Sequence, residues 1–287
     1  ASDVYKRQIL NRTINRDHIA IESLQILPER NISFSFTRPQ WFTFDSGDYV
    51  YINCPWISKL EWYPFNIISA RNDDSVLLNI KASGSWPKKI YKRTIRMLNE
   101  SSVDKLSIRI DGPYGSSSDK ILNTENVIIV AANTGVSKFA SILQDIAFRE
   151  RNNSIKYKVK NLYFVWLSDN DFYLEWFKKL LQELEKDFKL DYFDYHIFFM
   201  DRVAAELPIS MLYVSKDLYK DKINIDLVSH SKNKSSTGYP NWTSELKKIK
   251  SKYNDKKCTL FYSGPKNLKK ELTLACKRQE IDFNSES

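Results

Sequence analysis

The chain has 287 residues, 42% hydrophobic and 28% charged, which is a globular composition with enough length for two domains. No apolar run reaches the roughly 18 residues needed to cross a bilayer, so we expect this portion to be soluble. The net charge of +9 could suggest nucleic-acid binding, but the lysines stand beside acidic residues, which is typical of solvated helix faces and predicts no nucleic-acid partner.

The cysteines, histidines and carboxylates form no recognisable catalytic or metal-binding set. Cys54, Cys258 and Cys276 are odd in number and unevenly spaced, which excludes a disulfide framework and fits a reducing compartment. The three histidines lie far apart, and the sequence shows no triad, paired carboxylates or HExxH motif. We therefore expect no metal site and no hydrolase. The chain does not begin with methionine, so we expect it to be part of a longer protein.

Residues 15–118 are predicted to form an antiparallel β-barrel or sandwich. Short segments alternate apolar and polar residues and are separated by turn residues, the pattern of strands with one buried face. The expected strands are residues 18–27, 32–39, 48–55, 75–83 and 105–115. One segment, residues 87–100, is predicted to be a helix, and its basic cluster fits a plain surface helix or one that faces an anion.

From residue 119 onward, continuous apolar runs alternate with helical patterns. The runs are residues 126–132, 161–168, 195–200 and 258–265, and the helical patterns are residues 137–150, 172–188 and 266–279. This alternation predicts a parallel α/β sheet with crossover helices, a Rossmann-like domain at 119–287. The fold class is thus α/β plus β. Residues 201–237 are polar and irregular, and we expect a long loop or insertion there.

The chain has only seven glycines, and most of them follow a predicted strand. They are Gly47, Gly84, Gly112, Gly115, Gly135, Gly238 and Gly264. In a glycine-poor chain, those that remain mark positions where the backbone needs positive φ or close approach to another group. Because ligands of α/β sheets bind beyond the carboxyl ends of strands, these positions are candidate ligand contacts, with ordinary turns as the alternative.

An ordered series of motifs carries a family resemblance. The series includes LEWYPFNIISA (60–70), SGSW (83–86), DGPYG (111–115), VAANTGVSKF (130–139), TGYPNW (237–242) and YSGP (262–265). It resembles the cytosolic dehydrogenase domain of NADPH oxidases, within the ferric reductase superfamily, from about residue 17 to the C-terminus. All seven glycines fall where the motifs of that family have glycine. The resemblance implies a ferredoxin-reductase-type fold, with an FAD-binding barrel at 15–118 and an NAD(P)H-binding domain at 119–287.

The resemblance also implies a function. Hydride would pass from NADPH or NADH to FAD, and single electrons would then reach haems in a membrane domain outside this sequence and reduce O2 to superoxide. The implied partners are that haem domain of the same full-length chain and regulatory proteins, at the cytosolic face of a membrane. Two alternatives stay open: a ferric-chelate reductase module, and a degenerate, non-catalytic regulatory domain of the same fold.

The implied FAD contacts lie in the barrel. Tyr63 replaces a family histidine and keeps a ring that can stack on the flavin, Asn66 replaces a threonine, and Lys81 replaces an arginine. A hydrophobic barrel edge is the alternative for residues 63–70, and a buried structural role is the alternative for Trp86. The full implied set is Trp62, Tyr63, Pro64, Phe65, Asn66, Ser69, Asn79, Lys81, Gly84 and Trp86.

The implied NAD(P)H contacts depart further from the family. Ala131 and Asn133 replace glycines of the dinucleotide loop, but asparagine tolerates positive φ, so we expect the turn to form. DGPYG is expected to be a tight turn. No residue is expected to act as a catalyst, because hydride transfer is chemistry of the cofactors. The full implied set is Gly112, Pro113, Gly115, Asn133, Thr134, Gly135, Val136, Ser137, Ser168, Asp169, Tyr239, Ser263, Gly264 and Pro265.

Two family arginines that hold the 2′-phosphate of NADPH are missing. Residues 168–170 (Ser-Asp-Asn) fill the first place, and Tyr239 fills the second. Charge-assisted hydrogen bonds contribute about 1.5–3 kcal/mol each, so we expect weak discrimination in favour of NADPH. An acidic residue near the 2′ position favours a ribose diol, so the choice between NADPH and NADH stays open. The family chain ends in an aromatic residue that covers the flavin, and this sequence ends one residue short of that position.

Overall fold

The computed structural model describes residues 18–27, 30–82, 84–99, 106–115, 118–152, 157–168, 181, 184, 193–200 and 235–285. These residues divide into two compact units. The first contains the described residues up to Ser118 together with Ala140–Asp145. The second contains Asp119–Phe139 and the described residues from Ile146 onward.

The first unit contains two antiparallel sheets, with strand orders β1-β7-β4-β5 and β2-β3-β6. The strands are β1 (Ile19–Ala20), β2 (Ser23–Leu27), β3 (Asn31–Thr37), β4 (Tyr49–Asn53), β5 (Tyr63–Asn66), β6 (Ser75–Lys81) and β7 (Ser107–Tyr114). In β3, Ile32, Phe34 and Phe36 are buried while the residues between them are half-buried, so one face of the strand meets the core. The predicted antiparallel β-structure is confirmed.

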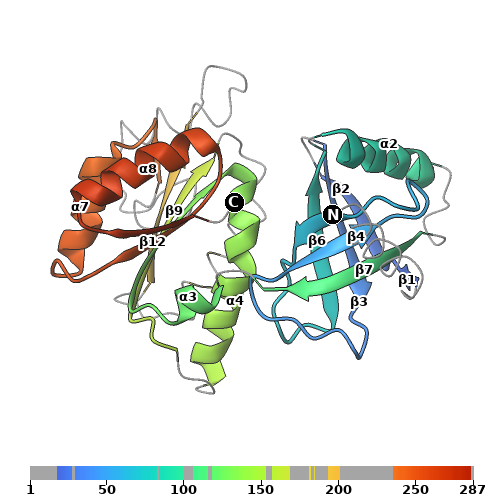
Figure 1. Cartoon of the computed structure of the whole chain (residues 1–287), viewed down its shortest axis with the longest axis horizontal. Helices are drawn as coiled ribbons and strands as arrows, with labels where there is room; N and C mark the ends of the chain where they lie inside the picture. Colours follow the sequence, from blue (N-terminus) through green and yellow to red (C-terminus); the bar gives the residue numbers. More distant parts are fainter. Residues whose placement is uncertain are drawn as a thin grey trace, which may run out of the picture. The chain divides into compact units, whose positions relative to one another are not determined.

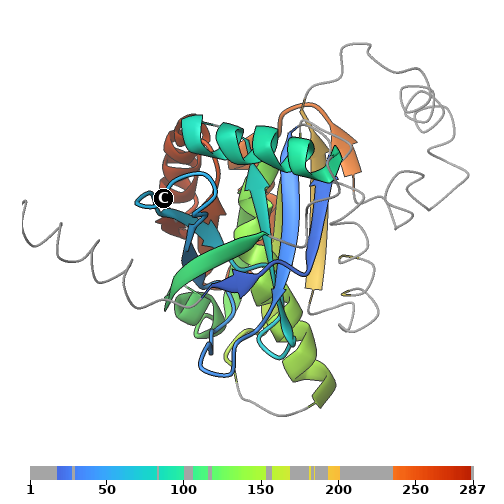
Figure 2. The ribbon, with the colours of Figure 1, turned by 90° about the vertical axis from the view of Figure 1, so that its right-hand side faces the viewer.

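Helix α2 (Ser85–Asn99) packs on the strands of this unit. Trp86, Ile90 and Thr94 are buried at a spacing of four residues, which places them on one face of the helix. Trp86 and Ile90 belong to the same apolar core as the strand residues. In Figures 1 and 2 the helix lies across one end of the strands. The helix predicted at 87–100 is therefore confirmed.

The strand predicted at 18–27 is two strands that belong to different sheets. Ile21 N donates to Leu106 O at 3.1 Å, whereas Glu22 N donates to Ser35 O at 2.9 Å. The chain thus changes its pairing partner between these two residues, and β1 pairs with β7 while β2 pairs with β3. Alternation of apolar residues continues through the change, which is why the sequence pattern shows one segment.

The DGPYG motif is not the tight turn that the sequence predicts. Its first four residues extend β7, and the pairing of Tyr49 with Tyr114 and of Tyr51 with Asp111 leaves one extra residue in β7. This extra residue makes a β-bulge. Gly112 has φ of 137° at the bulge, where a side chain is strained. The prediction was wrong because a bulge and a turn require the same residue types.

The second unit contains one parallel sheet of order β11-β10-β9-β8-β12-β13. The strands are β8 (Asn126–Ala132), β9 (Asn161–Ser168), β10 (Phe193–Phe199), β11 (Ser235–Thr237), β12 (Thr259–Ser263) and β13 (Asp282–Ser285). All seven residues of β8 are buried, as expected for a central parallel strand with both faces covered. The predicted parallel α/β sheet is confirmed.

Helices connect these strands. They are α3 (Ser118–Leu122), the 3₁₀ turn η2 (Asn133–Val136), α4 (Ser137–Asn152), α7 (Trp242–Lys252) and α8 (Lys266–Arg278). Trp242 and Leu246 of α7 and Leu272 of α8 share an apolar core with β8, β9 and β12, so both helices cover the same face of the sheet, as Figure 1 shows. The helices predicted at 137–150 and 266–279 are confirmed.

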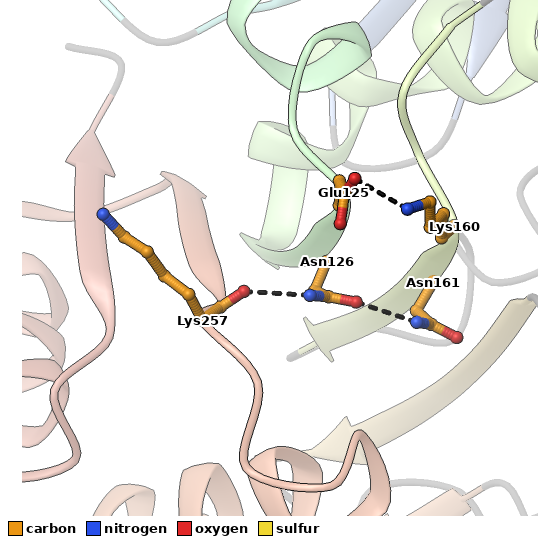
Figure 3. A network of polar contacts seen from close by, with 5 residues as sticks. All are labelled: Glu125, Asn126, Lys160, Asn161 and Lys257. Carbon is orange, nitrogen blue, oxygen red and sulfur yellow. Dashed lines mark hydrogen bonds and ion pairs between the residues drawn. The ribbon is translucent and has the colours of Figure 1, made fainter.

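A polar network joins the amino-terminal ends of three strands (Figure 3). Asn126, at the start of β8, donates through Nδ2 to Lys257 O at 2.9 Å and accepts from Asn161 Nδ2 at 2.8 Å. Beside it, Lys160 and Glu125 form an ion pair at 2.7 Å, and the hydrogen bond from Lys160 holds the pKa of Glu125 below its ordinary value. The network ties together the amino-terminal ends of β8, β9 and β12. It thereby helps to set the relative positions of these strands up to their carboxyl ends.

Some sequence predictions fall partly outside the described residues. In the helix predicted at 172–188 only Leu181 and Leu184 are described, and both are helical. Of the irregular segment at 201–237, the last three residues form β11, and the others lie outside the described residues. All three cysteines are free and buried. Within the described part of the chain, no helix is long and apolar enough to span a membrane, and no group of metal-ligating residues is found.

Candidate functional site

The aromatic residues of β5 lie against a tryptophan of α2. Tyr63 and Phe65 alternate on the strand and therefore share a face. The Tyr63 ring stacks on Trp86 with centroids 4.2 Å apart and an interplanar angle of 17°, and the Phe65 ring lies 5.9 Å from Trp86. Trp86 is fully buried, whereas Tyr63 and Phe65 are only half-buried. Part of each β5 ring thus remains accessible to a planar ligand, with Trp86 as the support beneath.

Pro64 and Asn66 occupy the alternate positions of β5. The strand stands at the edge of its sheet and pairs only with β4 among the described strands. An edge position tolerates proline, which cannot donate to a second neighbour, and Pro64 is exposed. Asn66, paired with Tyr49, is half-buried at the end of the strand. A strand at this position was not predicted, because four residues that include a proline give too little alternation.

Several buried polar atoms of the first unit have no hydrogen-bond partner within the described part of the chain, and three of them belong to the predicted flavin set. These three are Trp62 Nε1, Trp86 Nε1 and Asn79 Oδ1. Buried polar groups are normally paired, because leaving one unpaired costs about 1–3 kcal/mol. Two donors and one acceptor that all come from the predicted flavin set fit a ligand with both ring and polar groups. FAD has both, so the residues present fit this cofactor.

The start of α2 is suited to an anion. Gly84 has φ of 97°, and a Cβ built there would meet only Pro87 Cδ at 3.9 Å, so backbone conformation rather than crowding requires the glycine. The first turn of α2 contains no acidic residue, and its free N–H groups carry partial positive charge. Lys81 and Lys88, one before and one within the helix, are both exposed. This local charge fits the pyrophosphate of a dinucleotide.

Ser69 has a structural contact. It is buried, and its Oγ accepts a hydrogen bond from Leu77 N at 3.2 Å, which ties the segment after β5 to β6. The hydroxyl proton of Ser69 can still be donated elsewhere. The predicted contacts Gly112, Pro113 and Gly115 also lie in the first unit, in β7 or directly after it.

The predicted dinucleotide loop joins β8 to α4. Asn133 has φ of 50°, so asparagine takes the left-handed conformation that the sequence led us to expect. Trp166 Nε1 donates to Asn133 O at 3.4 Å and supports the loop from β9. Val136 is fully buried and belongs to the core, while Ser137 begins α4, whose first turn contains no acidic residue. Thr134 lies within the turn, and its side chain is outside the described residues.

The loop contacts the end of β12 directly. A Cβ built on Gly135 would lie 2.3 Å from Ser263 O, so only glycine fits there. Gly264 is equally confined, since its Cβ would lie 2.5 Å from Tyr262 Oη and 2.8 Å from Ala132 Cβ. Both glycines therefore allow two adjacent strand ends to pack closely, which leaves backbone groups of both at one edge of the sheet.

The segment YSGP is held by its tyrosine. Tyr262 Oη donates to Pro265 O at 2.8 Å, and burial raises the pKa of Tyr262, so the phenol remains a donor. Pro265 precedes the first residue of α8, and both Gly264 and Pro265 are exposed. Ser263 is buried at the end of β12 and pairs with Ala131. An exposed glycine at a helix start beside the β8 loop is suited to close approach of a ligand.

Of the residues predicted at the end of β9, only Ser168 is described. It is fully buried, and its carbonyl accepts from Met200 N at 3.0 Å. Asp169 and Asn170 lie outside the described residues.

The segment TGYPNW follows β11 and begins α7. Gly238 has φ of 90°, and Asn241 caps the helix by accepting from Ser244 N at 3.1 Å. Trp242 is buried in the core. Tyr239 is half exposed at 52%, and its hydroxyl donates to Glu271 Oε2 at 2.8 Å. Partial burial, and then contact with the Glu271 carboxylate, raises the pKa of Tyr239.

The structure thus brings most predicted nucleotide contacts of the second unit to one edge. Because the sheet is parallel, the loop after β8, Ser168 of β9, the YSGP segment after β12 and Tyr239 after β11 all lie at its carboxyl edge. Ligands of open α/β sheets bind at this edge. The sequence did not identify Trp166, Tyr262 or Glu271. Trp166 and Tyr262 sit inside apolar runs, and Glu271 is one charge among several on α8, so no sequence signal marked them.

Comparison with known proteins agrees with this geometry. Residues 17–118 match the FAD-binding domain family, and residues 124–277 match the family of the ferric reductase NAD binding domain. The chain is 29% identical over 248 residues to NADPH oxidase 1 of Mus musculus, which covers 84% of the chain and 40% of that protein. It is 29% identical over 258 residues to a superoxide-generating NADPH oxidase heavy chain of Dictyostelium discoideum, covering 86% and 48%. The chain therefore spans less than half the length of these relatives.

Among solved structures, a ferredoxin NADP+ reductase from Neisseria gonorrhoeae with bound FAD and NADP is similar in fold. The TM-score is 0.62 at 11% identity, covering 94% of this chain and 98% of that one. At this identity the likeness concerns the fold alone.

The two domains are those of a flavin-dependent NAD(P)H oxidoreductase. The chain belongs to the ferric reductase family, and NADPH oxidases are among its relatives. The predicted family, the predicted fold and the presence of FAD- and NAD(P)H-binding domains are confirmed. The individual contact residues remain predictions.

Proposed function

We propose that this chain is the dehydrogenase module of an NAD(P)H oxidase. It holds FAD on the first unit and a reduced nicotinamide nucleotide on the second, passes reducing equivalents to haems in a membrane domain, and so supports reduction of O2 to superoxide. The observation that carries the proposal is the gathering of the nucleotide motifs at the carboxyl edge of a sheet in a chain that also has an FAD-binding domain. The names of its relatives support the oxidase assignment.

The residues of the first unit position the flavin. Tyr63 and Phe65 offer ring faces supported by Trp86, and the start of α2 offers N–H groups and lysines to the pyrophosphate. Trp62 Nε1 and Asn79 Oδ1 supply a donor and an acceptor that no described residue uses. When bound, FAD accepts a hydride and releases electrons singly. The protein itself contributes binding and orientation.

The residues of the second unit position the nucleotide. The β8–α4 loop presents backbone N–H groups beside the α4 start, and Gly135 and Gly264 let this loop and the YSGP segment pack closely at the same edge. Tyr262 fixes the Pro265 carbonyl and thereby the path of the YSGP segment. No proton has to be moved by a side chain, because hydride transfer is chemistry of the cofactors.

The membrane part of the proposal rests on the relatives. The chain spans 40% and 48% of their length, so the proposed haem domain belongs to the remainder of a longer protein. We propose the cytosolic face of a membrane as the location of the module, with the haem domain and regulatory proteins as its partners and no nucleic acid.

A ferric-chelate reductase is the second candidate, because residues 124–277 match the family of the ferric reductase NAD binding domain. The two candidates differ in the terminal acceptor only. In the full-length protein, superoxide production that exceeds ferric-chelate reduction with the same donor supports the oxidase, and the reverse ratio supports the reductase.

The test of the proposal begins with the purified chain and FAD. We expect stoichiometric binding of FAD and, under anaerobic mixing with NADH or NADPH, bleaching of the flavin absorbance. A folded chain that binds neither FAD nor a nicotinamide nucleotide would overturn the proposal and favour a non-catalytic regulatory domain. Binding of both without bleaching would also contradict the proposed hydride transfer.

A further inference from the structure

The pair formed by Tyr239 and Glu271 has a defined place at the carboxyl edge of the parallel sheet. Tyr239 directly follows β11, and Gly238 N donates to Phe199 O at 2.9 Å, so the backbone is tied to β10. On its other side, Asn241 caps α7 and Trp242 is buried. Tyr239 is therefore fixed from both directions, and its hydroxyl reaches Glu271 Oε2 of α8 at 2.8 Å.

The exposed carboxylate of Glu271 can be approached by a ligand. Its neighbours on the same helix face, at three and four residues on either side, are Asn267, Leu268, Leu274 and Ala275, none of them basic. No ion pair to Glu271 is formed within the described part of the chain, and the residue is exposed. Tyr239 occupies Oε2, which leaves Oε1 as an acceptor.

Glu271 lies in the second turn of α8, the helix that starts directly after the YSGP segment. The predicted nucleotide contacts gather at this same edge. In dinucleotide sites an acidic side chain accepts hydrogen bonds from the free ribose diol of NAD, whereas NADP sites offer a cation to the 2′-phosphate. Tyr239 also occupies the position at which the family resemblance expects an arginine, so a cation is replaced by a neutral donor that holds an anion.

We propose that Glu271, positioned by Tyr239, is the residue that selects NADH and rejects NADPH in this chain. The carboxylate accepts from the adenosine ribose diol and repels the 2′-phosphate, which carries a charge of about −1.5 to −2 near neutral pH. This inference rests on the proposed function and adds the substrate: the electron donor is the nucleotide without the 2′-phosphate. Tyr239 is a positioning residue, because it acts through Glu271.

The test compares two probes that differ only in the 2′-phosphate, namely 5′-AMP and 2′-phospho-AMP. Their dissociation constants are measured by calorimetry on the whole chain, so the readout does not depend on flavin or turnover. We expect the wild-type chain to bind 5′-AMP at least as tightly as 2′-phospho-AMP. Glu271→Gln should shift the ratio of the two constants about tenfold toward 2′-phospho-AMP at low salt, and the shift should shrink as salt screens the charge.

Glu280→Gln is the matched control. It makes the same change of charge and side-chain size, but Glu280 follows the other end of α8, at the opposite edge of the sheet. The ratio should stay at its wild-type value in this variant. Tyr239→Phe keeps the ring and removes the hydroxyl that holds Glu271, so it should shift the ratio in the same direction as Glu271→Gln by a smaller factor.

Three results would overturn the inference. These are a wild-type chain that binds 2′-phospho-AMP more tightly than 5′-AMP, a ratio in Glu271→Gln no different from that in Glu280→Gln, and a ratio in Tyr239→Phe equal to the wild-type value. In each case nucleotide binding itself would persist, so the proposed function would stand. A folded chain that binds neither probe nor NADH would instead overturn both.

Discussion

Gly135 of the β8–α4 loop lies against Ser263 at the end of β12, so closely that a Cβ on Gly135 would be 2.3 Å from Ser263 O and 2.8 Å from Ser263 C. Both are backbone atoms, so they cannot move away from a Cβ by a change of rotamer as the end of a flexible side chain can. The single glycine left in the loop is thus retained by packing within the protein. The same contact holds the loop and the YSGP segment together, and both segments are predicted to contact the nucleotide. Gly135 therefore also supports the predicted binding site.

Gly135→Ala should therefore destabilise the second unit. Overpacking of this kind costs typically about 1–3 kcal/mol, because the backbone must shift to accept the methyl group. We expect a lower urea midpoint and weaker nucleotide binding. Gly115→Ala is the control for stability, since φ is not left-handed there and the nearest atom to its Cβ is Asp48 Oδ1 at 4.0 Å. Equal urea midpoints for the two variants would contradict the packing argument.

Asn133 gives a second test of the loop. Its φ of 50° is accessible to asparagine and glycine, whereas a β-branched residue is strongly disfavoured. Asn133→Val should cost about 1–2 kcal/mol and weaken nucleotide binding, and Asn133→Gly should retain both properties. Asn254 has φ of 54° and lies after α7, away from the predicted site. Asn254→Val should lower stability similarly without changing nucleotide affinity, and a loss of affinity there would contradict a local effect at Asn133.

The sequence predicted the parallel sheet well because the signal there is local. The apolar runs of β8, β9 and β12 are buried along their length, and each is followed by a turn signal. The prediction of a turn at DGPYG was wrong because a bulge in β7 uses the same residues. Glu271 could not be found from sequence at all. Its contact with Tyr239 spans 32 residues and exists only because α7 and α8 pack on the same face of the sheet.

Tyr63 allows flavin contact to be separated from core packing. Tyr63 and Tyr91 are both half-buried and both pack on the core of the first unit, but only Tyr63 belongs to the predicted flavin set. Replacing either tyrosine with alanine should reduce stability by similar amounts. Tyr63→Ala should also raise the dissociation constant of FAD about two- to tenfold, which corresponds to the about 0.5–1.5 kcal/mol that an aromatic contact contributes. An equal rise in Tyr91→Ala would contradict a direct contact of Tyr63 with the flavin.

The polar network at the amino-terminal ends of β8, β9 and β12 contains both buried hydrogen bonds and an exposed ion pair, so their contributions to stability can be compared. Asn126 is 5% exposed, and Asn126→Ala leaves Lys257 O and Asn161 Nδ2 without their partner, which should cost about 1–3 kcal/mol. Lys160 and Glu125 are 65% and 54% exposed, so Lys160→Ala should cost at most about 1 kcal/mol.

The two variants should respond differently to salt. At high salt the ion pair is already screened in the wild type, so Lys160→Ala should no longer lower the stability. The loss of stability in Asn126→Ala should be the same at low and high salt. Urea titrations at low and high salt measure both. A larger loss for Lys160→Ala than for Asn126→Ala would mean that the ion pair, and not the buried amide pair, fixes the starts of β8, β9 and β12.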